Sequence, residues 1–122
     1  MTGIAAALRW VVRLDGIGAL ILGIILWTGS LGILKIHILT GFILSVTMFL
    51  IGIVGFLARV KPPLPIVAIL WALLLPYVGF AQRRPLPGAG HVIVQVIHLL
   101  IGICAIGIAE ALAAKIKRQA CA

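Results

Sequence analysis

The chain has 122 residues, of which 64% are hydrophobic and only 10% are charged, a balance that excludes a soluble globular domain. Its formal net charge of +8 does not indicate a nucleic acid partner, because Lys and Arg commonly flank membrane-spanning helices. The composition therefore predicts one all-α integral membrane domain over residues 1–122, in the lipid bilayer of a bacterial or archaeal cytoplasmic membrane.

Four apolar stretches, each close to the roughly 20 residues that cross a bilayer, predict a four-transmembrane-helix bundle. The predicted spans are residues 14–32, 34–58, 64–82 and 89–115. Gly29 and Gly32 predict a tight turn where the first span ends, so its regular helix is expected to stop near Thr28. Pro62 and Pro63 end the second span, because proline cannot continue a helix.

The Lys and Arg residues are distributed unevenly between the two sides of this bundle. Seven of them lie at the two chain ends and in the segment 59–63, and three lie on the other side. Since positive residues are enriched in cytoplasmic segments, we expect both termini to be cytoplasmic.

Two copies of a His-x-x-x-Gly motif lie in the second and fourth spans. They are His37 with Gly41 and His98 with Gly102, 61 residues apart in the chain. A histidine in hydrocarbon is costly and needs a partner. A glycine one helical turn away removes the side chain where a flat ligand would lie. The repeated spacing is also consistent with a two-helix internal repeat, in which the second and fourth helices are parallel.

This pattern points to haem held between the two imidazoles, with His37 and His98 as the axial metal ligands and Gly41 and Gly102 beside them. Two alternatives remain at this point. The histidines can instead form interhelical hydrogen bonds, with Thr40 or Gln95 as partners. Three histidines at one level can also bind zinc or copper.

A third histidine, His91, falls on the same face of the fourth span as Gln95 and His98, and we expect this polar face to point into the bundle. His91 has three interpretations: an interfacial residue without a special role, a haem propionate contact or proton relay, or the axial ligand in place of His98. Arg83 and Arg84 precede this span and can bind propionates or lipid headgroups.

The two carboxylates, Asp15 and Glu110, are both expected near the cytoplasmic end in structural roles. Asp15 can accept from the first amides of the first helix or pair with a basic neighbour, and Glu110 is expected in a structural ion pair. A sharper interpretation of Asp15 is a proton- or cation-coupling acid. In that respect the chain is similar in size to the small multidrug-resistance transporters, which carry an acid in the first helix.

In architecture and in the two His-x-x-x-Gly motifs, the chain resembles four-helix membrane b-type cytochromes of the b561 sort. The resemblance implies one haem b at most per chain, since only three histidines are present. It also implies electron transfer near the outer membrane face, from a quinol, as an oxidoreductase component. The other hypotheses are a noncatalytic small subunit of a larger respiratory or transport complex, a homo-oligomer, or a small multidrug-type transporter that uses Asp15.

Overall fold

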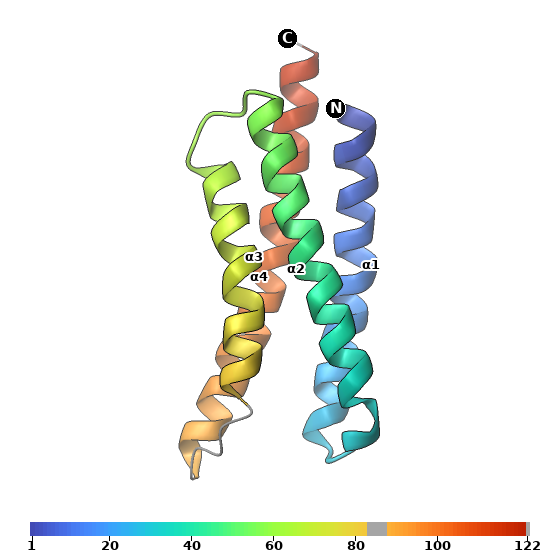
Figure 1. Ribbon diagram of the computed structural model, residues 1–122, viewed down its shortest axis with the longest axis vertical. Helices are drawn as coiled ribbons and strands as arrows, with labels where there is room; N and C mark the ends of the chain where they lie inside the picture. The colour runs from blue at the N-terminus through green and yellow to red at the C-terminus, as the bar shows by residue number, and fades with distance from the viewer. Residues whose placement is uncertain (83–87, 122) are drawn as a thin grey trace.

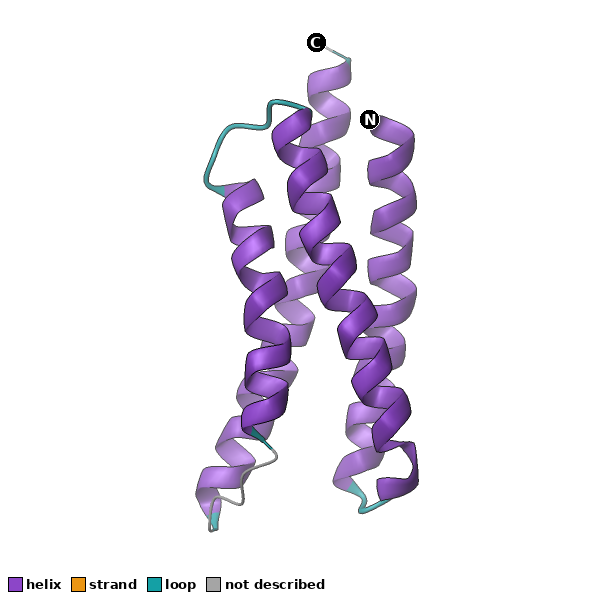
Figure 2. Cartoon of the chain, in the orientation of Figure 1, coloured by secondary structure: helices purple, strands orange, loops and turns teal. Residues whose placement is uncertain are grey.

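The computed structural model describes residues 1–82 and 88–121 and confirms the four-helix bundle (Figure 1). Its elements are α1 (Thr2–Trp27), the short 3-10 helix η1 (Leu31–Ile33), α2 (Leu34–Leu57), α3 (Leu64–Ala81) and α4 (Ala89–Ala120). The described residues contain no strand (Figure 2). All four α-helices are long and apolar enough to cross a membrane, which identifies an integral membrane protein.

The helices form two hairpins, α1–α2 and α3–α4, and both termini lie at the same end as the α2–α3 connection (Figure 1). We call this the terminal end, and the opposite one the histidine end. Around the bundle, α2 and α4 each contact both α1 and α3, and they also meet each other across the centre. They run in the same direction, as the two His-x-x-x-Gly motifs predict. The two hairpins diverge toward the histidine end (Figure 1).

Two helix boundaries differ from the prediction. α1 begins at Thr2 rather than near Leu14, because the run Ala5–Leu8 favours a helix and the two arginines that follow find a carboxylate partner. α4 continues to Ala120 rather than ending near Lys115, since its last turns contain strong helix formers and no Gly or Pro. Asp15 therefore lies in the middle of α1 and not near its start.

The tightly packed core lies in the terminal half. The largest fully buried side chains there are Val12, Met48, Ile51, Pro65, Leu112 and Ile116. Close helix contact is made possible by Gly52, where a Cβ would lie 2.6 Å from Cγ1 of Ile69. Many large apolar side chains remain exposed on the outside of the bundle, as lipid contact requires.

Candidate functional site

The structure brings His37 of α2 and His98 of α4 together between the helices, in the half of the bundle at the histidine end. Their ring centroids are 6.1 Å apart and the ring planes are inclined at 72°. The sequence left a mismatch in depth between these residues and left open whether His91 faces His37 instead. The mismatch disappears because η1 adds a turn before α2, while the start of α4 extends to the very bottom of the bundle (Figure 1).

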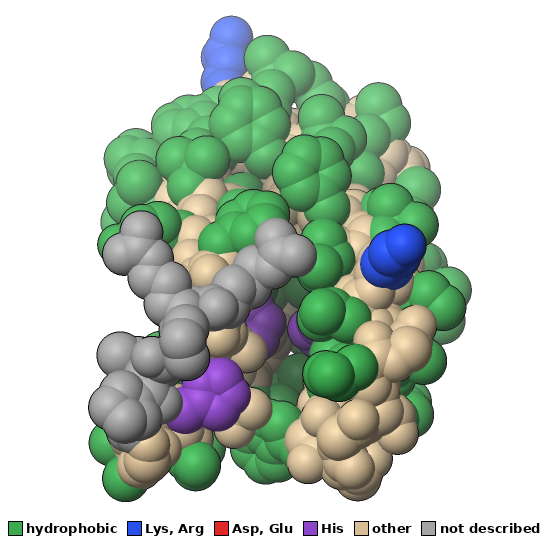
Figure 3. Space-filling model, turned by 60° about the horizontal axis from the view of Figure 1, so that its bottom comes forward, with side chains coloured by type: hydrophobic (Ala, Val, Ile, Leu, Met, Phe, Trp, Pro, Cys, Tyr) green, Lys and Arg blue, Asp and Glu red, His purple; other side chains and the backbone are tan. Residues whose placement is uncertain are grey.

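The two imidazoles border a cavity of about 390 Å³ at the histidine end, lined by residues from all four α-helices. This volume is within the range of roughly 300–1,000 Å³ that is typical of ligand pockets. Figure 3 shows histidine side chains inside a hollow at this end and another at its rim. The cavity exists because the two hairpins diverge here, so facing side chains do not fill the space between them.

Glycines supply much of the free space around the imidazoles. Gly41 and Gly102, predicted from the motif, both line the cavity. A Cβ at Gly41 would have no neighbour within 4 Å, and one at Gly102 would meet only Leu20. Gly41 therefore makes no close helix contact, which agrees with a space-making role.

Two further glycines, which the sequence interpretation missed, lie against the imidazole rings and line the same cavity. A Cβ at Gly23 of α1 would lie 3.3 Å from Cε1 of His37, and one at Gly79 of α3 would lie 3.4 Å from Cε1 of His98. Each ring thus packs against a glycine of the preceding helix in its own hairpin. The glycines can be read in the sequence. Which glycine lies opposite a histidine depends on the register of the hairpin, and the sequence pattern does not fix that register.

Both imidazoles have an unsatisfied nitrogen. Nδ1 of His37 and Nδ1 of His98 are buried without a hydrogen-bond partner. The carbonyl of Ala19 interacts with the His37 ring, but no hydrogen bond of ordinary geometry reaches Nδ1. A buried polar atom without a partner is unfavourable, and in a native protein it needs an explanation, such as a ligand that reorients the ring.

The hydrogen-bonding alternative has little support in this arrangement. The hydroxyl of Thr40 donates to the backbone carbonyl of His37 at 2.9 Å rather than to an imidazole. The amide of Gln95 pairs with Nε2 of His91 at 3.2 Å and not with His98. Within the described part of the chain, neither predicted partner therefore satisfies the facing histidines.

The two rings meet edge to face, at a centroid separation that an ordinary contact of two rings and a metal site with two imidazole ligands have in common. A metal–imidazole bond is about 2.0–2.1 Å long, so a metal held by two facing nitrogens sets the ring centroids roughly 6 Å apart once the ring radii are added. The observed 6.1 Å agrees with this value. Both planes of such a pair contain the metal–nitrogen axis, so any angle between them is compatible with ligation.

His91 lies apart from this pair, although it lines the same cavity together with Gln95. No group of three or more His, Cys, Asp or Glu able to hold a metal occurs in residues 1–82 and 88–121. The three-histidine zinc or copper site is therefore not formed there. Nε2 of Gln82, also at the cavity, is buried without a partner and offers a free donor. Arg83 and Arg84, the predicted propionate contacts, lie outside the described residues.

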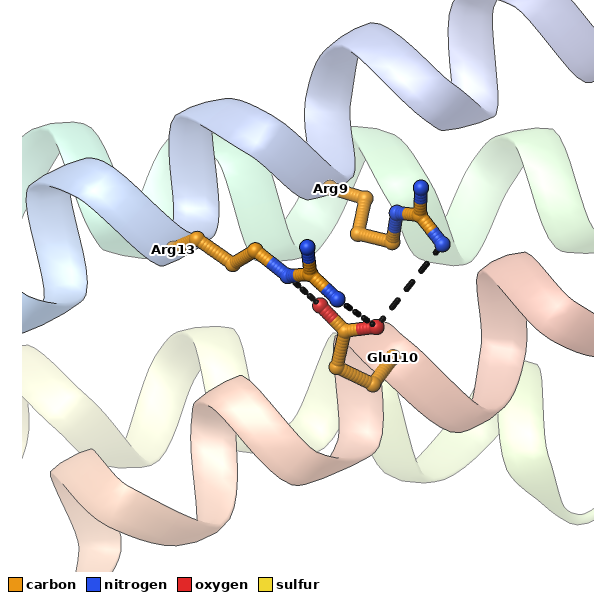
Figure 4. A network of polar contacts seen from close by, with 3 residues as sticks. All are labelled: Arg9, Arg13 and Glu110. Carbon is orange, nitrogen blue, oxygen red and sulfur yellow. Dashed lines mark hydrogen bonds and ion pairs between the residues drawn. The ribbon is translucent and has the colours of Figure 1, made fainter.

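A second polar cluster lies between α1 and α4 nearer the terminal end (Figure 4). The guanidinium of Arg13 donates to both carboxylate oxygens of Glu110, from Nη2 at 2.9 Å and also from Nε. Nη1 of Arg9 lies 3.9 Å from the same carboxylate. The expected structural ion pair of Glu110 is confirmed.

Asp15 does not share in this pairing. Its carboxylate interacts with the backbone of Leu44 in α2, and Oδ2 is buried without a hydrogen-bond partner. The expectation that Asp15 pairs with a basic neighbour is therefore wrong, because both nearby arginines turn toward Glu110.

Comparison of the chain with known protein families, with curated proteins and with solved structures found no match.

Proposed function

We propose that this chain is a small membrane b-type cytochrome that binds one haem b between His37 and His98. The observation that carries the proposal is a pair of imidazoles that line one cavity, with ring centroids 6.1 Å apart. Nδ1 of each ring is buried without a hydrogen-bond partner. Haem supplies a one-electron redox centre when it is bound. With both termini in the cytoplasm, as the Lys and Arg distribution favours, the site lies near the outer face.

The residues of the cavity have separate roles in this proposal. His37 and His98 would hold the haem iron through one nitrogen each, and the contacts of their rings with Gly23 and Gly79 limit the positions that the rings can take. Gly41 and Gly102 leave space for a planar group one helical turn from each ligand. The amide of Gln82 can donate to a propionate carboxylate at the cavity. The surrounding apolar side chains keep water away from the redox centre, which is one way in which a protein tunes the reduction potential.

A quinol in the bilayer is the electron donor that we propose. The site is embedded among membrane-spanning helices, where a lipid-soluble reductant is available. Oxidation of a quinol to a quinone releases two electrons and two protons, so a single haem would have to pass the first electron to an external one-electron acceptor before it could take the second. His91, which lines the cavity beside Gln95, is the candidate to accept one of the protons.

The test is the reduced-minus-oxidised absorption spectrum of the protein purified in detergent from haem-replete cells, together with its haem-to-protein ratio. We expect the sharp α band of low-spin bis-histidine haem b at about one haem per chain. His98→Ala and His37→Ala should each remove that spectrum, while His91→Ala should keep it. Added imidazole should restore part of the low-spin spectrum to His98→Gly.

Two results would refute the proposal. A colourless wild-type protein from haem-replete cells would show that the cavity does not take haem. An unchanged spectrum and haem ratio in His98→Ala would show that the ligand pair is assigned incorrectly.

The unpaired carboxylate of Asp15 favours a second candidate function, that of a small proton-coupled exporter of cationic compounds. An ionisable side chain in the middle of a membrane helix, without a partner for one oxygen, is a common feature of ion and substrate pathways. Efflux of a cationic dye from vesicles, driven by a pH gradient and lost in Asp15→Asn, would support this candidate.

A further inference from the structure

A second cavity, of about 410 Å³, lies between α1 and α4 at the terminal end. Its wall on α1 includes Thr2, Gly3 and Arg9, and its wall on α4 includes Lys117. Two cationic side chains from different helices thus border one recess, and the described residues contribute no carboxylate to its lining. The haem site proposed above makes no use of this recess.

The positive charge of Arg9 is only weakly compensated. Within residues 1–82 and 88–121, the carboxylate that pairs with Arg9 belongs to Glu110, and Arg13 occupies both of its oxygens in a bidentate contact. Arg9 reaches that carboxylate only at 3.9 Å through Nη1, and its Nε is buried without a hydrogen-bond partner (Figure 4). The three side chains together carry a net charge of about +1, and Lys117 adds another across the recess.

The first turn of α1 adds partial positive charge at the same place. The first amides of any helix lack an intrahelical acceptor. Here no side chain caps them, and the first turn contains no acidic residue. A Cβ at Gly3 would have no neighbour within 4 Å, so the backbone is open to a ligand at this point. Exposed amides at a helix start attract anions, and here they add to the two cations.

From this arrangement we infer that the recess between Arg9 and Lys117 binds a phosphate group, supplied by the headgroup of an anionic phospholipid. Guanidinium and ammonium groups are the side chains that best bind phosphate oxygens.

The length of the two helices places this recess where lipid headgroups lie. α1 has 26 residues and α4 has 32, which correspond to about 39 and 48 Å at 1.5 Å per residue. The hydrocarbon layer is only about 30 Å thick, so the helix ends enter the headgroup region. Basic pockets between membrane helices on the cytoplasmic side are suited to anionic headgroups.

The test is thermal unfolding of the delipidated full chain in a neutral detergent, titrated with phosphatidylglycerol, with phosphatidylcholine or with inorganic phosphate. We expect phosphatidylglycerol to raise the Tm and the other two to have little effect. Arg9→Gln and Lys117→Gln should each raise the concentration of phosphatidylglycerol needed for half of that shift, by about fivefold per cation removed.

Lys61→Gln is the matched control, since this exposed lysine lies at the same end but outside the recess. It should leave the titration unchanged. Lys117 is also exposed, so Lys117→Gln should fold normally even if Arg9→Gln does not. Equal sensitivity of Lys61→Gln and Lys117→Gln would overturn the site, as would the absence of a phosphatidylglycerol effect. An equal shift with inorganic phosphate alone would overturn the lipid as the source.

Discussion

Two glycines of α2 should respond in opposite ways to the same substitution, Gly→Ala. Gly41 lines the cavity, and a Cβ there would have no neighbour within 4 Å. Gly52 lies against α3, where a Cβ would be 2.6 Å from Cγ1 of Ile69 and 3.2 Å from the carbonyl oxygen of Pro65. The comparison separates glycines that leave space for a ligand from glycines that pack helices.

The expected magnitudes follow from these distances. Ala is favoured over Gly in a helix by about 0.5–1 kcal/mol, so Gly41→Ala should raise the free energy of unfolding of the ligand-free protein by up to that amount. At Gly52 the same gain is opposed by overpacking, which costs about 1–3 kcal/mol. Relief is difficult, because Ile69 is β-branched and stiff at χ1 and the other contact is backbone. Gly52→Ala should therefore lose about 1–2 kcal/mol net.

Unfolding in mild detergent, followed by helical circular dichroism, measures both variants against the wild type without haem. A loss of stability in Gly41→Ala as large as that in Gly52→Ala would show that the cavity is closed in solution, which would refute the reasoning. Gly41→Leu extends the test to function. It should keep the fold and lower the haem-to-protein ratio, because its side chain occupies the space beside His37.

Three other substitutions test the packing of the bundle. Glu110→Gln should lower the Tm, because it leaves Arg13 without its bidentate partner between two membrane helices, and the added Arg13→Gln should recover part of the loss. Trp71→Phe should cost about 0.5–1.5 kcal/mol of unfolding free energy, since it removes the 2.9 Å hydrogen bond from Nε1 to the carbonyl of Ile101 that joins α3 to α4. Arg59→Gly should raise the unfolding free energy by about 0.5–1 kcal/mol, because Arg59 follows the C-cap of α2 with φ of 58°, which favours glycine. Chemical denaturation of each purified variant checks the direction.

Much of the architecture was predictable from hydropathy and from glycine and proline positions. The bounds of α2 and α3 agree with the prediction to within a residue, because a turn and a proline pair delimit the second span. The repeat of the motif in two parallel helices favoured His98 as the residue that faces His37, but the unequal depth of the two predicted spans left His91 open, and only the structure decides for His98. The proposed haem is not part of that agreement and stays a prediction.

Features that depend on side-chain partners across the bundle could not be predicted in the same way. Arg9 and Arg13 suggested a helix that starts after them, whereas the helix runs through both because α4 supplies Glu110 97 positions away from Arg13. The contact of Gly23 with His37 depends on the register of the α1–α2 hairpin, and hydropathy does not encode this register. Local patterns therefore located the spans, and long-range contacts decided their ends.

Asp15 provides the sharpest discrimination between the two candidate functions. It lies 13 positions after the start of α1, roughly 20 Å along the helix, and does not line the histidine cavity, although Gly16 and Ala19 do. If the chain is a cytochrome, Asp15→Asn should leave the haem spectrum and ratio unchanged and should raise the Tm, because it removes a charge with an unpartnered buried oxygen from an apolar environment. If the chain is an exporter, the same variant should fold as well and lose proton-driven dye efflux. Loss of haem in Asp15→Asn, with the fold intact, would contradict the separation of Asp15 from the cavity, on which the expected unchanged haem spectrum depends.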